Sequence, residues 1–406
     1  MKLYDTIVIG AGAAGLFYGA LSEPGTDSLI IDHSERPGLK LLLSGSGQCN
    51  ITHDGSIKDF ITRYGQNGRY IRSALYGANN LSLVEFLNKN GIKTVTRDDG
   101  KIFPESLKAS EILNMLIKKS EANGFPLLLK EHITDISSDD SDGTYIVKTE
   151  NSSFKTKKLV IAAGGMSYPK TGSDGSLYPL IEKLGIQMIP ARPALVPIYT
   201  HSYGYRNLSG ISFKAVLVRL LENNREIAAQ TGDILLTHRA FSGPAILDIS
   251  RYADKGHKLE INYIYPVTGQ RAADMIKADF QGNSRELHTY ISRIFKIPDA
   301  FAVKLIENAG ICPYMKTSCT EGDEITKIAE ALTCHRYAVS GTGSFSEAMV
   351  TAGGVSLDEV NLRNMESKKH SNLFFIGEVL DIDGDTGGFN LQFAYSSAMA
   401  AVKNKK

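Results

Sequence analysis

Residues 4–22 read YDTIVIGAGAAGLFYGALS, and this stretch decides the fold. The apolar run at 6–9 has the length of a buried strand, and the run at 13–21 is typical of a helix. Glycines follow the strand in the spacing G-x-G-x-x-G, namely Gly10, Gly12 and Gly15. A strand, a glycine loop and a helix in this order predict a dinucleotide-binding domain of the Rossmann-like α/β class.

Each glycine in this loop has a separate expected role. Gly10 permits the tight turn, Gly12 lets a pyrophosphate approach the backbone, and Gly15 lets the helix pack closely on the strand. The helix N-terminus presents free N–H groups and a positive dipole end to the phosphates. A second strand ends at Asp32, whose carboxylate is placed to accept hydrogen bonds from ribose hydroxyls. The motif by itself does not separate FAD from NAD.

Two further glycine clusters follow. Residues 44–50 read SGSGQCN and offer consecutive backbone N–H groups for a second phosphate-facing or flavin-facing loop. A surface turn has the same composition, so both interpretations stay open for this cluster. A strand-like run at 159–163 leads into Gly164 and Gly165, a junction that often lies beneath a bound dinucleotide. Only residues 10–15 form a complete fingerprint, so a separate nucleotide domain for NADPH is not predicted.

The end of the chain repeats the layout of a glycine loop that opens a helix. Residues 377–401 read GEVLDIDGDTGGFNLQFAYSSAMAA, and we expect the helix to begin near Gly388. A cofactor with adenosine at one end and a redox ring at the other can use two helix N-termini, the second stabilising negative charge on the reduced ring. The amides of Asn390 and Gln392 are candidate partners of that ring. The alternative is an ordinary terminal helix.

These motifs together resemble one family, the BaiN-like (YhiN-type) FAD-dependent oxidoreductases, some members of which are called aminoacetone oxidases. The resemblance spans nearly the whole chain in family order. Its matching stretches are IVIGAGAAGL (7–16), LLLSGSGQCNIT (41–52), KIFPESLKA (101–109), AAGGMSYPKTGSDGS (162–176), ALVPI (194–198), GDILLTHRAFSGPAILDIS (232–250), EAMVTAGGVSLDEV (347–360), NMESK (364–368) and LFFIGEVLDIDGDTGGFNLQFAYSSAMAA (373–401).

The resemblance implies FAD as the cofactor. By position it implies these cofactor contacts: Gly10, Ala11, Gly12, Ala13, Ala14, Gly15, Asp32, His33, Lys40, Ser44, Gly45, Ser46, Gly47, Cys49, Asn50, Ile133, Ala162, Ala163, Gly164, Gly165, Gly377, Glu378, Asp381, Gly387, Gly388, Phe389, Asn390, Leu391 and Gln392. This chain departs from the family at Gln48, where Arg is frequent, and at Phe389, where Tyr is usual.

The resemblance also implies the domain organisation. A Rossmann-like FAD-binding domain is expected from both chain ends, at 1–190 and 340–406, with an inserted β-rich domain at 191–268 and 317–339. A small helical subdomain is expected at 269–316, where helical runs lie at 271–280, 285–295 and 299–310. Within the first segment, a β-hairpin is expected around the turn at 139–143.

Composition excludes several classes of protein. The net charge of +1, with 22% charged residues, favours neither nucleic acid nor an anionic membrane as a partner. No apolar run of about 18 residues predicts a transmembrane helix, and the N-terminus enters a strand at once, so we expect a cytoplasmic protein. The four cysteines lack C-x-x-C spacing, and nothing near Cys334 and His335 completes a zinc set, so no metal site is predicted.

Four side chains are candidates for catalysis beside the flavin. His238 is a candidate proton donor, Arg239 a partner for a substrate carboxylate or carbonyl, and Glu347 a base. Tyr168 is a further polar candidate. A structural role competes for each of the first three: 238–239 reads as a turn whose Ser242 caps the following helix, and Glu347 as a capping or pairing residue.

The first hypothesis is an FAD-dependent oxidoreductase that transfers hydride through the flavin N5 and acts on a small organic substrate, with amine oxidation of the aminoacetone type as one candidate. O2 or transiently bound NAD(P)H would be its redox partner. The alternative enzyme is an NAD(P)H-dependent reductase of enones or steroid-like substrates. An alternative from another class is an FAD-binding protein with an RNA-associated or structural role, which the near-zero net charge disfavours. The sequence does not predict the oligomeric state.

Overall fold

The computed structural model describes residues 1–139, 142–278 and 285–403. The chain divides into two compact units, the first comprising Met1–Pro193 with Ala348–Lys406 and the second comprising Ala194–Glu347. The sequence proposed borders of the first unit after residues 190 and 339, and the expected separate helical subdomain at 269–316 stays a prediction. Both ends of the chain therefore contribute to one unit, and the middle of the chain forms the other.

The first unit is built on a mostly parallel sheet. Its central strand β1 (Leu3–Ile9) pairs in parallel with β2 (Ser28–Ile31) on one side and with β9 (Ser153–Ile161) on the other. Strand β20 (Leu373–Phe375) comes from the C-terminal segment and pairs in parallel with β9. The carboxyl ends of these strands share one edge, so the glycine loops that follow β1 and β9 lie at the same edge of the sheet.

Short strands extend this sheet on both sides. The strand order is β18-β19-β20-β9-β1-β2-β6, and β8 joins β7 to β9 in antiparallel pairing. These strands are β6 (Leu127–Leu128), β7 (Ile133–Asp139), β8 (Thr144–Thr149), β18 (Val360–Asn361) and β19 (Glu366–Ser367). Strands β7 and β8 are those of the expected hairpin, while residues 140–141 of its turn lie outside the described residues.

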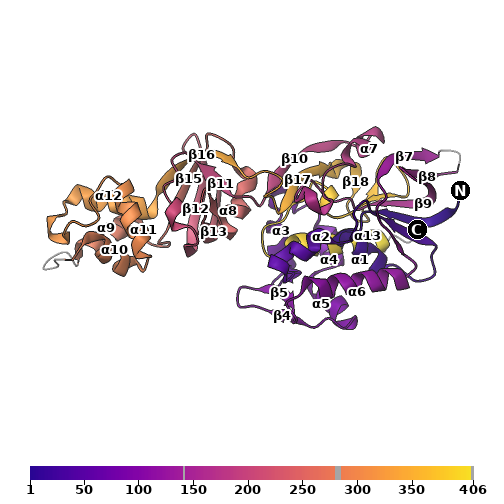
Figure 1. Cartoon of the computed structure of the whole chain (residues 1–406), viewed down its shortest axis with the longest axis horizontal. Helices are drawn as coiled ribbons and strands as arrows, with labels where there is room; N and C mark the ends of the chain where they lie inside the picture. Colours follow the sequence, from indigo (N-terminus) through magenta and orange to yellow (C-terminus); the bar gives the residue numbers. More distant parts are fainter. Residues whose placement is uncertain (140–141, 279–284, 404–406) are drawn as a thin grey trace. The chain divides into compact units, whose positions relative to one another are not determined.

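Helices from opposite ends of the chain pack together in this unit (Figure 1). Helix α1 (Ala13–Leu21) contacts both α13 (Phe389–Val402) and α6 (Ala109–Ala122). The rings of Phe17 and Tyr395 meet edge to face with centroids 5.4 Å apart. Small residues on α1 and α13 permit this close packing, and the two helices bring the two glycine loops into one unit.

The remaining elements of the first unit are short. Strands β3 (Thr52–His53), β5 (Lys101–Pro104) and β4 (Thr94–Thr96) form a small sheet, and β10 (Met188–Ala194) pairs with β17 (Val350–Val355). The helices are α2 (Leu39–Leu43), α3 (Ile57–Thr62), α4 (Arg72–Gly77), α5 (Asn80–Lys89) and α7 (Tyr178–Lys183).

The second unit contains a closed antiparallel barrel (Figure 1). Its strands follow the order β11 (Ile198–Thr200), β14 (Phe241–Ser242), β13 (Arg225–Leu236), β12 (Ser212–Glu222), β15 (Lys258–Asn262) and β16 (His335–Thr342). In its core, the Tyr337 hydroxyl lies 2.7 Å from the Tyr205 hydroxyl and 2.6 Å from the Tyr263 hydroxyl. These contacts satisfy three buried phenols, and α8 (Pro244–Ile249) packs on the barrel.

Helices complete the second unit. Helices α9 (Gly269–Ala278), α10 (Leu287–Phe295) and α11 (Asp299–Asn308) correspond to the expected helical runs, of which 279–280 lie outside the described residues. The segment 317–339 differs from the expected β-rich one, because most of it is α12 (Gly322–Thr333), which packs on α9. A capping box explains its start: the Glu321 N–H donates to the Glu324 carboxylate at 2.8 Å, while the Glu321 side chain accepts from the Glu324 backbone.

The expected fold class is confirmed: a Rossmann-like unit is formed from both chain ends and carries an inserted barrel with helices. In the ranges that the structure describes, every helix is too short or too polar to span a membrane.

Candidate functional site

The loop between β1 and α1 contains three glycines of the motif, and only one of them has empty space where a Cβ would be. A Cβ on Gly10, whose φ is +108°, would lie 2.4 Å from the Ala162 carbonyl oxygen, and one on Gly15 would lie 1.9 Å from the Gly10 oxygen. A Cβ on Gly12 would meet no atom within 4 Å. Gly10 and Gly15 are therefore required by the fold itself, whereas the open space at Gly12 fits a group that approaches the start of α1.

Asp32 lies at the end of β2 and faces this loop. Its Oδ2 accepts the Ala11 N–H at 2.6 Å, and its Oδ1 accepts the Ser34 N–H at 2.7 Å. The two backbone bonds fix the carboxylate against the glycine loop. Because an ionised carboxylate has about four acceptor positions, the remaining ones are free to accept ribose hydroxyls.

A pocket opens at the carboxyl edge of β1, β2 and β9. Its lining includes Gly10, Asp32, His33, Ile133, Gly164 and Tyr178. The His33 ring lies 5.2 Å from that of His132, which adds a flat wall. Sequence reasoning placed Ile133 here from the resemblance and missed Tyr178. The lining also includes Asp174. The apolar and aromatic walls together with the Asp32 carboxylate suit an adenosine group.

Tyr178 gives this pocket an unused donor. Its hydroxyl is buried and has no hydrogen-bond partner among the residues that the structure describes. Burial raises the pKa of the Tyr178 phenol, and the carboxylates of Glu378 and Asp381 raise it further, so it stays a donor. A buried hydroxyl without a partner is costly, and a bound nucleotide with phosphate and ribose oxygens would supply one. The residues present therefore fit FAD.

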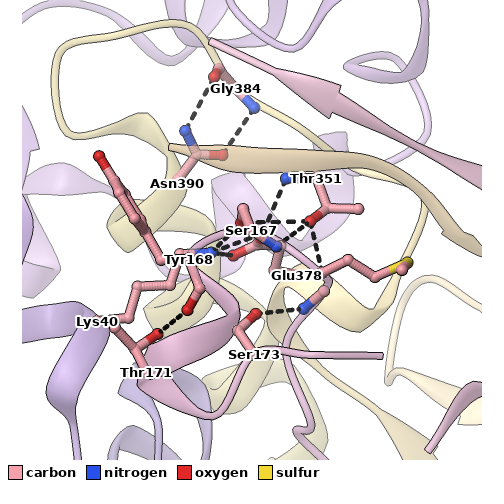
Figure 2. Close-up of polar contacts among 11 residues, drawn as sticks. Lys40, Ser167, Tyr168, Thr171, Ser173, Thr351, Glu378, Gly384 and Asn390 are labelled. Carbon is pink, nitrogen blue, oxygen red and sulfur yellow. Dashed lines mark hydrogen bonds and ion pairs between the residues drawn. The ribbon is translucent and has the colours of Figure 1, made fainter. Parts of the chain in front are cut away.

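A polar network lies in the same unit and joins four segments of the chain (Figure 2). Lys40 Nζ lies 2.7 Å from Glu378 Oε2 and also donates to the Ser167 hydroxyl. Glu378 Oε1 accepts the Ser167 hydroxyl at 2.8 Å and the Thr351 N–H at 2.9 Å. Lys40 and Glu378 were expected as cofactor contacts, and the structure places them against each other. Ser167 and Thr351 were missed, because nothing local in the sequence indicates these contacts.

The same network holds the second glycine junction. The Thr351 hydroxyl accepts the N–H groups of Met166 and Ser167 at 2.7 and 3.0 Å. A Cβ on Gly165 would lie 2.3 Å from that hydroxyl, so this glycine is needed for the close approach. The Ser173 hydroxyl accepts the Gly165 N–H at 3.1 Å (Figure 2). The loop after β9 is thus fixed by contacts within the protein.

The SGSGQCN loop lies against the loop that precedes α13. With the Asn50 amide turned so that both of its polar atoms meet a partner, its oxygen accepts the Gly388 N–H at 3.2 Å. A Cβ on Gly388 would lie 2.7 Å from the Thr52 Cα. Cys49 is buried in left-handed conformation, with φ at +60°, and burial raises the pKa of its thiol to about 11. Gln48, which replaces a frequent Arg, accepts a 2.6 Å hydrogen bond from Arg97, so a guanidinium is still present at this loop.

Two amides at the start of α13 form hydrogen bonds within the protein. Asn390 exchanges two hydrogen bonds with the backbone of Gly384, at 2.8 and 2.9 Å (Figure 2). Gln392 is fully buried, and its amide bonds the Thr52 hydroxyl at 2.7 Å and the Ala78 carbonyl at 3.0 Å. Both side chains are occupied within the protein. These bonds shape the loop, and the expected contact of the two amides with a flavin ring stays a prediction.

Asp381 and Phe389 also anchor this loop. Asp381 Oδ1 accepts the Gly353 N–H at 2.9 Å, which ties the loop to β17. The ring of Phe389 stacks on that of His53 with centroids 5.5 Å apart. The Phe389 carbonyl accepts the Tyr64 hydroxyl at 2.8 Å. These contacts fix the loop before α13 against β17 and against the segment around Tyr64.

The catalytic candidates fall in different units. His238 and Arg239 are exposed in the second unit. Helix α8 begins at Pro244 as expected, but its N-cap is Gly243 and Ser242 does not cap it. Glu347 Oε1 accepts the Tyr199 hydroxyl at 2.6 Å and an Arg239 N–H at 3.2 Å. The Tyr199 hydrogen bond lowers the pKa of Glu347, which weakens it as a base.

Tyr168 lies in the first unit beside the Lys40–Glu378 network. Its φ of +52° is unusual for a residue with a bulky side chain. Its carbonyl accepts the Thr171 hydroxyl at 2.7 Å, and its ring points away from the network (Figure 2). Strained residues of this kind gather at functional sites, so Tyr168 stays a candidate.

Compared with known families, residues 4–404 match the family described as HI0933-like protein Rossmann domain. The chain belongs to the HI0933-like family. The expected resemblance to BaiN-like and YhiN-type flavoproteins is thereby confirmed, and the HI0933-like chain is an FAD-dependent oxidoreductase. In the part of the chain that the structure describes, no group of three or more His, Cys, Asp and Glu side chains is placed to hold a metal ion.

Two curated relatives match nearly the whole HI0933-like chain. It is 31% identical to the ribosomal RNA dihydrouridine synthase of Escherichia coli (strain K12), over 100% of this chain and 98% of that protein. It is 25% identical to the 3-dehydro-bile acid delta(4,6)-reductase of Clostridium scindens, over 97% of each chain.

Among solved structures, the chain is similar to the 3-ketosteroid-delta4-(5alpha)-dehydrogenase of Rhodococcus jostii RHA1. The TM-score is 0.50 at 12% identity, over 99% of this chain and 97% of that one. This likeness shows a shared fold.

Proposed function

We propose that this protein reduces a carbon–carbon double bond conjugated with a carbonyl, and that its substrate is a uracil ring in ribosomal RNA. The observation that carries the proposal is the match to the E. coli dihydrouridine synthase, at 31% identity across both structural units. The match to the bile acid reductase is weaker but also spans both units.

The two relatives have one chemistry in common. Dihydrouridine differs from uridine by two hydrogens across C5=C6, a bond conjugated with the C4 carbonyl. A delta(4,6)-reductase of a 3-oxo steroid also saturates a double bond conjugated with a ketone. Both reactions need one hydride and one proton, and bound FAD supplies hydride chemistry at its flavin N5.

The chain itself must supply or route the proton. The Tyr168 hydroxyl is our candidate donor, because it belongs to a strained residue next to Ser167 of the Lys40–Glu378 network. His238, Arg239 and Glu347 of the second unit are further candidates for substrate contact. Glu347 is already paired with Tyr199 and Arg239, which favours positioning of Arg239 over base catalysis.

NAD(P)H is the proposed electron donor. The sequence holds one complete dinucleotide fingerprint, at Gly10 to Gly15, and the FAD-binding unit uses it. The donor would therefore bind transiently and without a Rossmann domain of its own. The competing hypothesis is that the protein oxidises an amine and passes the electrons to O2. The experiment below distinguishes the two.

The deciding experiment is an anaerobic incubation of the FAD-loaded protein with NADPH or NADH and unmodified ribosomal RNA. Digestion of the RNA and mass spectrometry of its nucleosides would reveal dihydrouridine. Parallel reactions contain a steroid enone or aminoacetone. Dihydrouridine formed only with enzyme and nicotinamide supports the proposal. Flavin reduction by aminoacetone with release of peroxide in air, and no dihydrouridine, would replace it with amine oxidation.

This proposal departs from the expectation that no nucleic acid binds. That expectation rested on the net charge of +1. Net charge is a sum over the whole chain and does not describe any single face of the molecule.

A further inference from the structure

We propose that an exposed surface of the first unit, made by Arg69, Tyr70, Arg72 and Tyr76, docks a single-stranded segment of the substrate RNA. We call these four residues the Arg–Tyr face. The inference rests on the proposed function and adds the place where the nucleic acid binds.

The Arg–Tyr face consists of two preformed cation–ring pairs. The Arg69 guanidinium lies 4.7 Å from the Tyr70 ring centroid and donates a 2.8 Å hydrogen bond to the Tyr70 hydroxyl. The Arg72 guanidinium lies 5.5 Å from the Tyr76 ring centroid. Tyr70 and Tyr76 are 42% and 48% exposed, so both rings remain accessible at the surface.

The segment that carries this face is firmly seated. Ile71, Ala74 and Leu75 are each at most 2% exposed and lie in the same core as α13. The polar residues of α4 and of the turn before it are thereby held at the surface. The packing of these buried residues fixes the backbone that carries the arginine and tyrosine side chains of the face.

The residue types suit single-stranded RNA. Unpaired bases stack on aromatic rings and on guanidinium planes, and arginine also binds phosphate. Among the described residues, neither Arg69 nor Arg72 forms an ion pair with a carboxylate, so both charges are available to a polyanion. Lys403 adds a third cation, because its Nζ bonds the Gly77 carbonyl at the end of α4 at 3.2 Å.

Direct hydrogen bonds join the segment before this face to the loop before α13. Asn67 donates to the Asp381 carbonyl at 2.8 Å, and the Asp385 N–H donates to the Arg63 carbonyl at 2.8 Å. The Tyr64 hydroxyl donates to the Phe389 carbonyl at 2.8 Å. The face therefore borders the loop that opens α13, the candidate flavin-facing element. When RNA binds to the Arg–Tyr face, the nucleotides on either side of the bound segment lie close to the loop before α13.

The test is fluorescence anisotropy of a labelled single-stranded RNA of about a dozen nucleotides, titrated with FAD-loaded protein over a range of salt concentrations. We compare Arg69→Ala/Arg72→Ala, Tyr70→Ala/Tyr76→Ala and Tyr70→Phe/Tyr76→Phe with the wild type. The arginine double variant removes two phosphate contacts. The plot of log affinity against log salt should therefore become less steep, by about 1.4 in slope. Removing two stacking rings should weaken binding by about tenfold or more per ring, while the Phe variants should keep most of the affinity.

A matched control removes two exposed cations elsewhere, by Lys214→Ala/Arg225→Ala on strands β12 and β13. FAD content and thermal melting confirm that each variant is folded. The proposal is overturned if the wild type does not bind RNA, if the face variants bind like the wild type, or if the control loses as much affinity. Failure of the proposed function gives a different result from failure of the docking proposal. In that case the wild type forms no dihydrouridine, whether or not it binds RNA through this face.

Discussion

Lys40 and Glu378 lie 338 positions apart in the chain, and their side chains form an ion pair at 2.7 Å in the FAD-binding unit. We predict that Lys40→Met and Glu378→Gln each lower the free energy of unfolding by about 1–3 kcal/mol, less than for a fully buried pair because the side chains are 25% and 19% exposed. Removing both should cost less than the sum of the two, and urea unfolding of the four proteins measures the difference. Additive losses would show that the pair is not coupled.

Gly12 and Gly15 should respond in opposite ways to an added side chain. Gly12→Val should fold and melt near the wild-type temperature but purify without FAD, because its Cβ points into open space where the cofactor belongs. Gly15→Ala should destabilise the protein by about 1–3 kcal/mol or prevent folding, because its Cβ would lie 1.9 Å from the Gly10 oxygen. Absorbance of the bound flavin and circular dichroism separate the two results. Full FAD content in Gly12→Val would contradict the site.

Tyr178→Phe removes a hydroxyl that has no hydrogen-bond partner within the described parts of the chain. The unfolding free energy of the FAD-free protein should stay within about 0.5 kcal/mol of wild type or rise. Affinity for FAD should fall by about three- to tenfold, because a hydrogen bond to the cofactor is lost. Titration of FAD into both apoproteins checks this, and equal affinities would place the hydroxyl outside the cofactor site.

Cysteine reactivity should depend on burial. Cys312 and Cys319 are exposed, whereas Cys49 is buried and burial raises the pKa of its thiol to about 11. At pH 8 the thiolate fraction of Cys49 is then about 0.1%, and it grows only as the pH approaches 11. Iodoacetamide labelling at pH 8 should modify Cys312 and Cys319 within minutes and Cys49 only after unfolding in urea. Rapid native labelling of Cys49 would show that the SGSGQCN loop opens.

Tyr168→Phe tests the proton donor. FAD content should be unchanged, because the Tyr168 backbone makes the contacts to Thr171 and the variant keeps them. Formation of reduced product should slow by about 100-fold or more, as expected when a general acid is lost. Product formation at the wild-type rate would assign the proton to another group, and His238→Ala and Glu347→Gln are the next variants to measure.

The sequence predicted the first glycine loop well because its logic is local. Gly10, Gly12, Gly15 and Asp32 lie within 23 consecutive positions, and each has a role that strand–loop–helix geometry fixes. The structure shows which of these roles the protein itself enforces: Gly10 and Gly15 are needed for packing, and Gly12 leaves space.

The sequence was less informative about side chains that face distant segments. Gln392 and Asn390 looked like free amides at a helix start, yet both are bound to the protein. Helix α12 was missed although Glu321 and Glu324 form a recognisable capping box, because the surrounding domain was expected to be β-rich. Tyr178 could have been found only from burial, since an unpartnered hydroxyl has no signature in the sequence.

The sequence by itself determined the α/β class, the position of the nucleotide loop and the family, because backbone conformation at glycine and the period of apolar residues are local properties. Only the tertiary structure decided that Lys40 meets Glu378, that Thr351 closes the Gly165 junction and that the Arg–Tyr face borders the loop before α13. These contacts join segments far apart in the chain. Their partners are selected by packing of the whole unit, which no local pattern specifies.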